Sequence, residues 1–316
     1  MKTLHIVDGE STGGTLRRAR PGREEEILRW RDALYTGPVP SGLSLRRLSR
    51  VRSQFWTNGK SNTEFDKRDA CLLRYRQFDE VVMWFGADCT LCQLSLAQVL
   101  SWLYEQKTAP HRLSWVSRHG GELTAEHMHA AYRKRKPLHA TQLREASHTW
   151  DAFRASSPEA LARRSKLRTS CIPGHGRAIH RMLQEYPWLH GGLSRLERKL
   201  LRVIQAEAEL QAAKAVATVL QTETVGDLLL FDMLRDFDSA PNPIVRYAAP
   251  FTNKINSYKF NSAMLTLTDT GRRVLSGKDD HVTLNGVDRW IGGVHLHGHS
   301  VPWRWDEQHQ RIVRSR

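Results

Sequence analysis

Asp79-Glu80-Val81-Val82-Met83-Trp84-Phe85 is the stretch of this chain that decides its fold. The unbroken apolar run from Val81 to Phe85 is typical of a β-strand that is covered on both faces. Gly86-Ala87-Asp88 ends the run, and a long apolar stretch up to Tyr104 then predicts a helix. A buried strand that leads through a short loop into a helix indicates a parallel sheet packed between helices.

The flanking sequence repeats this pattern. Leu4–Val7 is predicted to be a strand, followed by a Gly-rich loop and a helix over Thr15–Arg20. Glu26–Trp30 and Leu113–Val116 are two further predicted strands. Because strands alternate with helices, residues 1–122 are expected to form an α/β ligand-binding domain with a parallel sheet.

The pattern then changes to helices alone. Residues 123–190 are predicted to form a basic helical segment, with helices over 124–133, 141–153, 157–167 and 175–185. This segment is expected to follow the α/β domain as a separate part of the chain.

Residues 191–316 are expected to form an α+β domain. Ser194 and Glu197 fit a capping box at the start of its first helix, and further helices are predicted near 208–220 and 225–237. A strand near Leu265, a short helix ending at Gly277 and a C-terminal β-hairpin then resemble the end of a winged-helix domain, as in the bacterial MarR and PadR regulators. The strand-like stretches behind this prediction are 281–284, 290–297, 303–305 and 311–313.

Positive charge is the clearest bulk property. Lys and Arg number 48 against 33 Asp and Glu, which gives a formal net charge of +15. The excess is densest in residues 126–190, with 12 basic and 5 acidic residues. Such a charge favours polyanionic partners through Coulomb attraction and counterion release. The cluster Arg133-Lys134-Arg135-Lys136 is therefore either a solvated helix face or a surface that meets phosphates.

Two more arginines stand beside tryptophans, at Arg289-Trp290 and Trp303-Arg304-Trp305. These side chains either stack on nucleic-acid bases or pack against their own domain. The predicted nucleic-acid-binding residues are thus Arg133, Lys134, Arg135, Lys136, Arg289 and Arg304.

The sequence features that indicate the cellular compartment are consistent with the small number of cysteines. No apolar run has the ~18 residues of a membrane span, and the N-terminus does not resemble a signal peptide. With four Cys in 316 residues, a cytoplasmic protein with reduced thiols is expected. Cys89-x-x-Cys92 has redox or metal spacing, but a zinc site needs a second pair, and Cys71 and Cys171 are isolated. We therefore expect buried structural thiols and no metal site at the cysteines.

A candidate ligand site follows from the sheet. Ligands of parallel α/β sheets bind beyond the carboxyl ends of the strands, where acidic residues follow each of the first three predicted strands. Such carboxylates could hold Mg²⁺ or serve as acid and base, while the loop Ser11-Thr12-Gly13-Gly14 offers hydroxyls and amides to an anion. The predicted ligand-binding residues are Asp8, Glu10, Ser11, Thr12, Arg31, Asp32, Asp88 and Gln93.

The same residues also have structural interpretations. Asp88 stands where a helix N-cap belongs, Asp8 lies in a turn, and Arg31 and Asp32 can pair with neighbours. His295, His297 and His299 alternate, which suits either a metal site or surface and packing histidines.

Several phrases together resemble one bacterial family. They are His5-Ile6-Val7-Asp8-Gly9-Glu10-Ser11, Trp30-Arg31-Asp32, Gly37-Pro38-Val39-Pro40, Trp84-Phe85-Gly86-Ala87-Asp88 with Cys92-Gln93, Leu284 to Leu296 and Trp303-Arg304-Trp305-Asp306. The chain is similar over nearly its whole length to the uncharacterised family called domain of unknown function 1835. The resemblance implies a bacterial cytosolic protein and assigns no activity.

Two functions stay open. The first is a small-ligand-binding α/β domain coupled to a nucleic-acid-associated winged-helix-like module. The alternative is a metal-dependent enzyme that acts on a phosphorylated or nucleotide-like substrate at the sheet edge. No catalytic motif in the sequence assigns a reaction.

Overall fold

The computed structural model describes residues 2–19, 24–57, 59, 63–117, 124–167, 170–248 and 263–315. It consists of two compact units. The first contains residues 1–182 together with 290–294, and the second contains residues 183–289 and 295–316.

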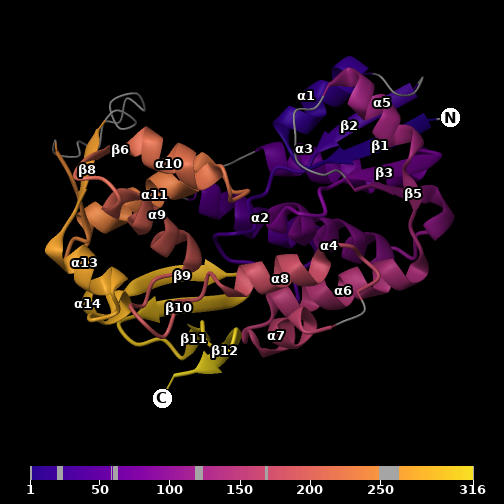
Figure 1. Ribbon diagram of the computed structural model, residues 1–316. Helices are drawn as coiled ribbons and strands as arrows, with labels where there is room; N and C mark the ends of the chain where they lie inside the picture. Colours follow the sequence, from indigo (N-terminus) through magenta and orange to yellow (C-terminus); the bar gives the residue numbers. More distant parts are fainter. Residues whose placement is uncertain are drawn as a thin grey trace. The chain divides into compact units, whose positions relative to one another are not determined.

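A five-stranded sheet forms the centre of the first unit (Figure 1). Its strands are β1 (Lys2–Val7), β2 (Glu24–Arg29), β3 (Glu80–Trp84), β4 (Leu113–Val116) and β5 (Lys136–Pro137), in the order β2-β1-β3-β4-β5. The first four are parallel, and only the short edge strand β5 pairs antiparallel, with β4. The predicted parallel α/β sheet is confirmed.

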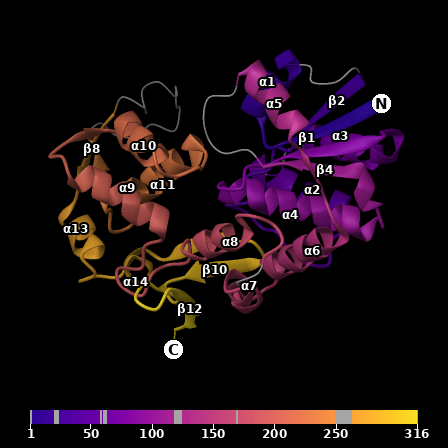
Figure 2. The same ribbon diagram turned by 45° about the vertical axis from the view of Figure 1, so that its right-hand side comes forward.

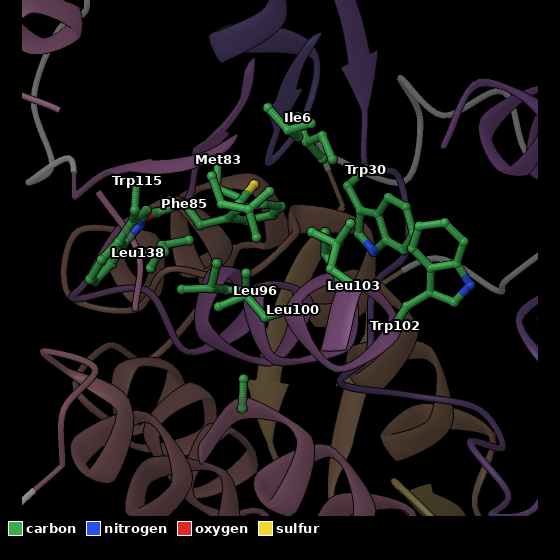
Figure 3. Close-up of a cluster of buried hydrophobic side chains, with 14 of the residues drawn as sticks. Ile6, Trp30, Met83, Phe85, Leu96, Leu100, Trp102, Leu103, Trp115 and Leu138 are labelled. Carbon is green, nitrogen blue, oxygen red and sulfur yellow. The ribbon is translucent and has the colours of Figure 1, made fainter. Parts of the chain in front are cut away.

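The alternation of side chains along the strands builds two apolar layers. Leu4 and Ile6 of β1 point to one face of the sheet, where they join Met83 and Phe85 in one core cluster. Val7 belongs to a second cluster, as successive residues of a strand face opposite sides. Figure 3 shows Ile6, Met83 and Phe85 beside Leu96 and Leu100 of the first cluster.

Helices cover both faces. α1 (Glu10–Ala19) and α5 (Ala125–Arg133) supply Leu16 and Met128 to the second cluster, while α3 (Thr63–Leu73) and α4 (Thr90–Glu105) cover the other face. α6 (Ala140–Arg154) packs on α4, which explains why α4 is apolar around most of its circumference. The remaining helices of this part are α2 (Leu45–Trp56), α7 (Glu159–Ser165), α8 (His175–Leu183) and the 3₁₀ turns Tyr75–Gln77 and Pro110–Arg112.

The second unit begins with α9 (Arg195–Gln205), β6 (Leu210–Gln211), α10 (Ala212–Leu220), α11 (Asp227–Ser239), β7 (Val245–Tyr247) and β8 (Met264–Leu267). Its three strands form an antiparallel sheet in the order β6-β8-β7. The predicted capping box of α9 is confirmed: Ser194 Oγ accepts from the Glu197 N–H at 3.3 Å, and the Glu197 carboxylate accepts from the Ser194 N–H at 2.7 Å.

The C-terminal elements are short (Figure 2). They are α13 (Asp269–Leu275), α14 (His281–Asn285), β9 (Val287–Ile291), β10 (Val294–Gly298), β11 (Trp303–Asp306) and β12 (Arg311–Arg314). Strand pairs β9–β10 and β11–β12 each form a small sheet.

Two local predictions in this region are wrong. Residues 281–284 are helical because the Asp280 carboxylate caps α14, accepting from the Thr283 N–H at 2.9 Å. The predicted strand over 290–297 is divided by a turn at Gly292-Gly293, where Gly292 has a φ of 61° that favours glycine.

Candidate functional site

The sheet order defines where a ligand is expected. β1 lies between β2 and β3 in the sheet. The chain passes from β1 to β2 on one side and then crosses to β3 on the other side, so the strand order reverses between β1 and β3. Ligands of doubly wound sheets bind in the crevice outside such a reversal point. A cavity of about 300 Å³ lies beyond the carboxyl ends of β1 and β2, lined by Asp8, Trp30, Arg31, Asp32, Ala33, Leu91, Cys92 and Ser95.

Asp8 joins two helix starts at this cavity. Its Oδ1 accepts from Thr12 Oγ1 at 2.5 Å, within the first turns of α1. Its Oδ2 lies 3.3 Å from Cys92 Sγ, in the first turn of α4. The Asp8 carboxylate thus faces the cavity between the elements that follow β1 and β3.

Arg31 is held between two acidic side chains. It pairs with Glu10, and its Nη1 lies 2.7 Å from Glu64 Oε2. Glu10 also pairs with Arg29 Nε at 3.1 Å. The Arg31 side chain is 46% exposed and lines the cavity. Glu10 pairs with the two arginines and is not among the lining residues.

Asp32 is part of the fold. Its carboxylate accepts from Arg52 Nη2 at 2.7 Å and Nε at 3.0 Å, and both side chains are fully buried. Arg52 also donates to the carbonyls of Thr36 and Ala33. This ion pair fastens the loop after β2 to α2, as in the structural interpretation of Asp32.

Asp88 and Gln93 lie outside the cavity lining. The exposed Asp88 pairs with Arg177 at 2.7 Å, and the prediction that it caps α4 is wrong, because Cys89 occupies the N-cap and its sulfur accepts from the Cys92 N–H. Gln93 is buried: Nε2 donates to the Gly86 carbonyl at 2.9 Å, and Oε1 lies 3.2 Å from His175 Nδ1. Gln93 therefore supports the loop after β3.

The Gly-rich stretch is helical. α1 begins at Glu10, and the Gly13 N–H donates to the Gly9 carbonyl at 3.1 Å. The expectation of an open loop over 11–14 is wrong, since Ser11 is exposed on the first turn of α1 and Thr12 is buried against Asp8.

The predicted magnesium set does not converge. Glu10, Asp32 and Asp88 each pair with an arginine on a different element. Among the residues that the structure describes, no three His, Cys, Asp or Glu side chains are grouped to hold a metal ion. The residues present therefore do not fit a Mg²⁺ centre.

The four cysteines also differ from expectation. Cys89 and Cys92 form a disulfide, and Cys171 is exposed, so the prediction of four reduced, buried thiols is wrong. Cys71 alone fits it: burial and a hydrogen bond to Glu26 raise the pKa of its thiol to about 12.

The predicted nucleic-acid-binding residues fall into two groups. Arg133, Lys134 and Lys136, at the end of α5 and in β5, are exposed. The other three lie in ion pairs: Arg135 Nε with Glu80 at 2.8 Å, Arg289 with Glu197, and Arg304 Nη1 with Asp280 at 3.0 Å.

The second unit holds a larger cavity, of about 610 Å³, which sequence reasoning missed. It is lined by ionisable groups that include Glu197, Asp236, His281, Asp288, Arg289, His297 and His299. The one signal in the sequence was the alternation of histidines. Two of them line the cavity, while His295 Nε2 pairs with Asp288 at 2.7 Å.

The surroundings of these groups shift their pKa values in different directions. Burial and the neighbouring Asp232 raise the pKa of Asp236, and burial lowers the pKa of His281. Burial opposes ionisation of Glu197, but the Arg289 guanidinium prevails and holds the pKa of Glu197 below its usual value. A polar cavity lined by perturbed groups is a second candidate ligand site.

Comparison with known proteins adds no relative: no family model matches the chain, and no curated protein is significantly similar to it in sequence. Within its described residues, the chain has no helix that is both long and apolar enough to span a membrane.

Proposed function

We propose that the first unit binds a small polar ligand at the sheet edge and that the second unit is a winged helix, in a bacterial cytosolic protein that associates with nucleic acid. The observation that carries the proposal is the cavity outside the β1/β3 reversal point, bordered by Asp8, Arg31 and Ser95. Asp8 can accept hydrogen bonds from hydroxyl or amino groups, and Arg31 can donate to an anion. A volume of about 300 Å³ suits a ligand no larger than a nucleoside or its monophosphate.

Calorimetric titration of the four ribonucleosides and their 5′-monophosphates, with and without Mg²⁺, tests the ligand site. We expect at least one compound to bind and Asp8→Asn to weaken it about tenfold, since a charged hydrogen bond contributes about 1.5 kcal/mol or more. Asp88→Asn is the matched control, because Asp88 faces Arg177 and not the cavity. Failure of the whole panel to bind, or equal losses in both variants, would contradict the proposed site.

The order of elements supports the winged-helix assignment. Helix, strand, two helices and two strands follow one another from α9 to β8, and the sheet order β6-β8-β7 is that of winged-helix domains. In this arrangement α11 takes the place of the helix that enters the major groove. However, α11 carries Asp227, Asp232, Asp236 and Asp238 against the single Arg235, so phosphates would repel it.

The proposed nucleic-acid contact therefore uses the exposed basic cluster Arg133, Lys134 and Lys136 of the first unit. It is tested by binding of labelled duplex DNA and single-stranded RNA over a salt series. Changing all three residues to Gln should lower the salt slope by about 2 to 3, since each phosphate contact contributes about 0.9. Changing the exposed Arg46, Arg47 and Arg50 to Gln removes the same charge elsewhere and should leave the slope nearly unchanged. Absence of binding at physiological salt, or equal effects of both triple variants, would refute the contact.

A metal-dependent enzyme acting on a phosphorylated or nucleotide-like substrate is the alternative. It has less support, because Glu10, Asp32 and Asp88 are engaged by arginines.

A further inference from the structure

Cys89 and Cys92 lie at the carboxyl edge of the sheet, directly after β3. They occupy the N-cap and the first turn of α4, the helix that follows the central strand β3. The structure joins them in a disulfide, with Cα atoms 5.2 Å apart. A Cys-x-x-Cys pair at a helix start after a strand of an α/β sheet has the spacing of thiol–disulfide chemistry.

The two sulfurs have different surroundings. Cys89 is partly exposed, whereas Cys92 is only 7% exposed. Cys89 Sγ accepts from the Cys92 N–H at 3.1 Å, and the dipole of the 16-residue helix adds positive potential there. Both effects stabilise a thiolate on Cys89 when the pair is reduced, which makes Cys89 the accessible nucleophile.

The buried sulfur has a base beside it. Asp8 Oδ2 lies 3.3 Å from Cys92 Sγ, on a loop that follows a different strand. A thiol of Cys92 can donate its proton to this carboxylate, which also accepts from Thr12. Cys92 borders the sheet-edge cavity together with Asp8, so the proton can leave toward solvent.

The other two cysteines have no such arrangement. Cys71 lies buried against Glu26, and Cys171 hydrogen-bonds to Glu145; burial and these carboxylates raise the thiol pKa values to about 12 and about 11. Both are therefore poor nucleophiles at neutral pH, and the buried Cys71 provides an internal reference for the pair.

We propose that Cys89 and Cys92 are a redox-active pair that reduces a disulfide bond, either in a partner protein or in the disulfide form of a small thiol. The Cys89 thiolate attacks one sulfur of the partner disulfide and expels the other as a thiolate, which takes up a proton. Asp8 then accepts the proton of Cys92, whose thiolate attacks Cys89 Sγ in the mixed disulfide. The protein disulfide forms, the second partner thiolate leaves and is protonated, and two electrons have passed to the partner. A dithiol reductant reverses the cycle. This chemistry needs no ligand in the cavity and stands apart from the proposed ligand binding.

The test uses the full-length Cys171→Ser protein, in which the pair and the buried Cys71 remain. After equilibration in glutathione buffers of graded ratio, alkylation and mass spectrometry should show a reversible two-electron transition of the pair within the accessible range. A pair that stays wholly reduced or wholly oxidised across that range, or reacts only after unfolding, would refute the proposal.

Single variants separate the roles. With the reduced protein and 5,5′-dithiobis(2-nitrobenzoate), we expect two thionitrobenzoate ions per pair. Cys92→Ser should release one and retain the other on Cys89, whereas Cys89→Ser should react much more slowly. Identical behaviour of these two variants would overturn the assigned order of attack.

Asp8→Asn tests the base. It should leave the first release unchanged and slow the second by at least about tenfold at pH 7, with recovery as the pH rises toward 8.5, where a free thiol ionises unaided. A purely structural Asp8 would alter both phases at every pH. The nucleoside titrations fail or succeed independently, because none of these reactions contains a nucleoside.

Discussion

The two cavities hold their arginine–carboxylate pairs differently. Beside the sheet-edge cavity, the Asp32 and Arg52 side chains are both wholly buried, and Arg52 also donates hydrogen bonds to loop carbonyls. In the second unit, Glu197 is buried, but Arg289 is 22% exposed and both line the cavity. The first pair fixes a loop and has no capacity left for a ligand, whereas the second presents charge to a polar space. Whether a charged side chain can bind a ligand is therefore indicated better by the partners that it already has than by its position at a sheet edge.

Removing the cation of the closed pair should give the largest effect. Arg52→Met leaves the buried Asp32 carboxylate with only the more distant Arg68 guanidinium, whose Nη1 lies 3.9 Å away, and the loss should be about 3–4 kcal/mol of unfolding free energy. Hydrogen exchange read on peptides of the first unit measures it, because a chain of two units need not unfold in one step. Arg50→Met, at an exposed position of the same helix, should change stability by less than about 0.5 kcal/mol. Similar exchange in both variants would show that Asp32 is not held as described.

Protonation of either one of two buried histidines in the first unit should have the next largest effect. Burial lowers the pKa of His175 from 6.5 to about 4, helped by Arg164 and opposed by Glu145. Burial lowers the pKa of His5 to about 4 as well, with Arg135 acting in the same direction against Glu80. The unfolded chain takes up these protons near pH 6.5 and the folded chain only near pH 4, so the stability is complete above pH 6.5 and is lost as the pH falls toward 4. The expected loss is about 3 kcal/mol for each histidine.

His175→Asn isolates one of these contributions. The Asn amide keeps a donor for Gln93 Oε1 but does not titrate, so the variant should lose less stability than the wild type between pH 6.5 and pH 4. Exchange rates of first-unit peptides over this pH range, corrected for intrinsic rates, provide the measurement. Equal slopes in both proteins would mean that His175 is not buried in its neutral form.

The sequence predicted what depends on local pattern. Continuous apolar runs located β3 and β4, and Ser194 with Glu197 marked the start of α9, because strand and cap signals lie within a few residues. It placed Asp8, Arg31 and Asp32 at one sheet edge, since parallel strands end together.

Long-range partners could not be predicted in this way. Asp32 pairs with Arg52 twenty positions away, and Asp88 pairs with Arg177 eighty-nine positions away. The cavity of the second unit brings Glu197, Asp236 and Arg289 together from three elements. The sequence around any one of these residues does not indicate that the other two lie beside it.

The open pair should respond less than the closed one. Arg289→Met removes the guanidinium beside Glu197, but the cavity of about 610 Å³ lets water reach the remaining carboxylate. We expect a loss of about 1–3 kcal/mol at pH 7, below that of Arg52→Met. The comparison is made by hydrogen exchange on α9 peptides.

The stability lost in Arg289→Met should depend on pH. In the wild type Arg289 holds the pKa of Glu197 below its usual value, so the pair stabilises the fold above the unfolded pKa and its contribution disappears as acid protonates Glu197. In Arg289→Met the lone carboxylate is protonated more readily, which removes the unpaired charge. The difference between the two proteins should therefore be greatest near neutrality and shrink as the pH falls below about 5. A difference that stays constant with pH would mean that Arg289 stabilises the second unit by packing its side chain and not through its charge.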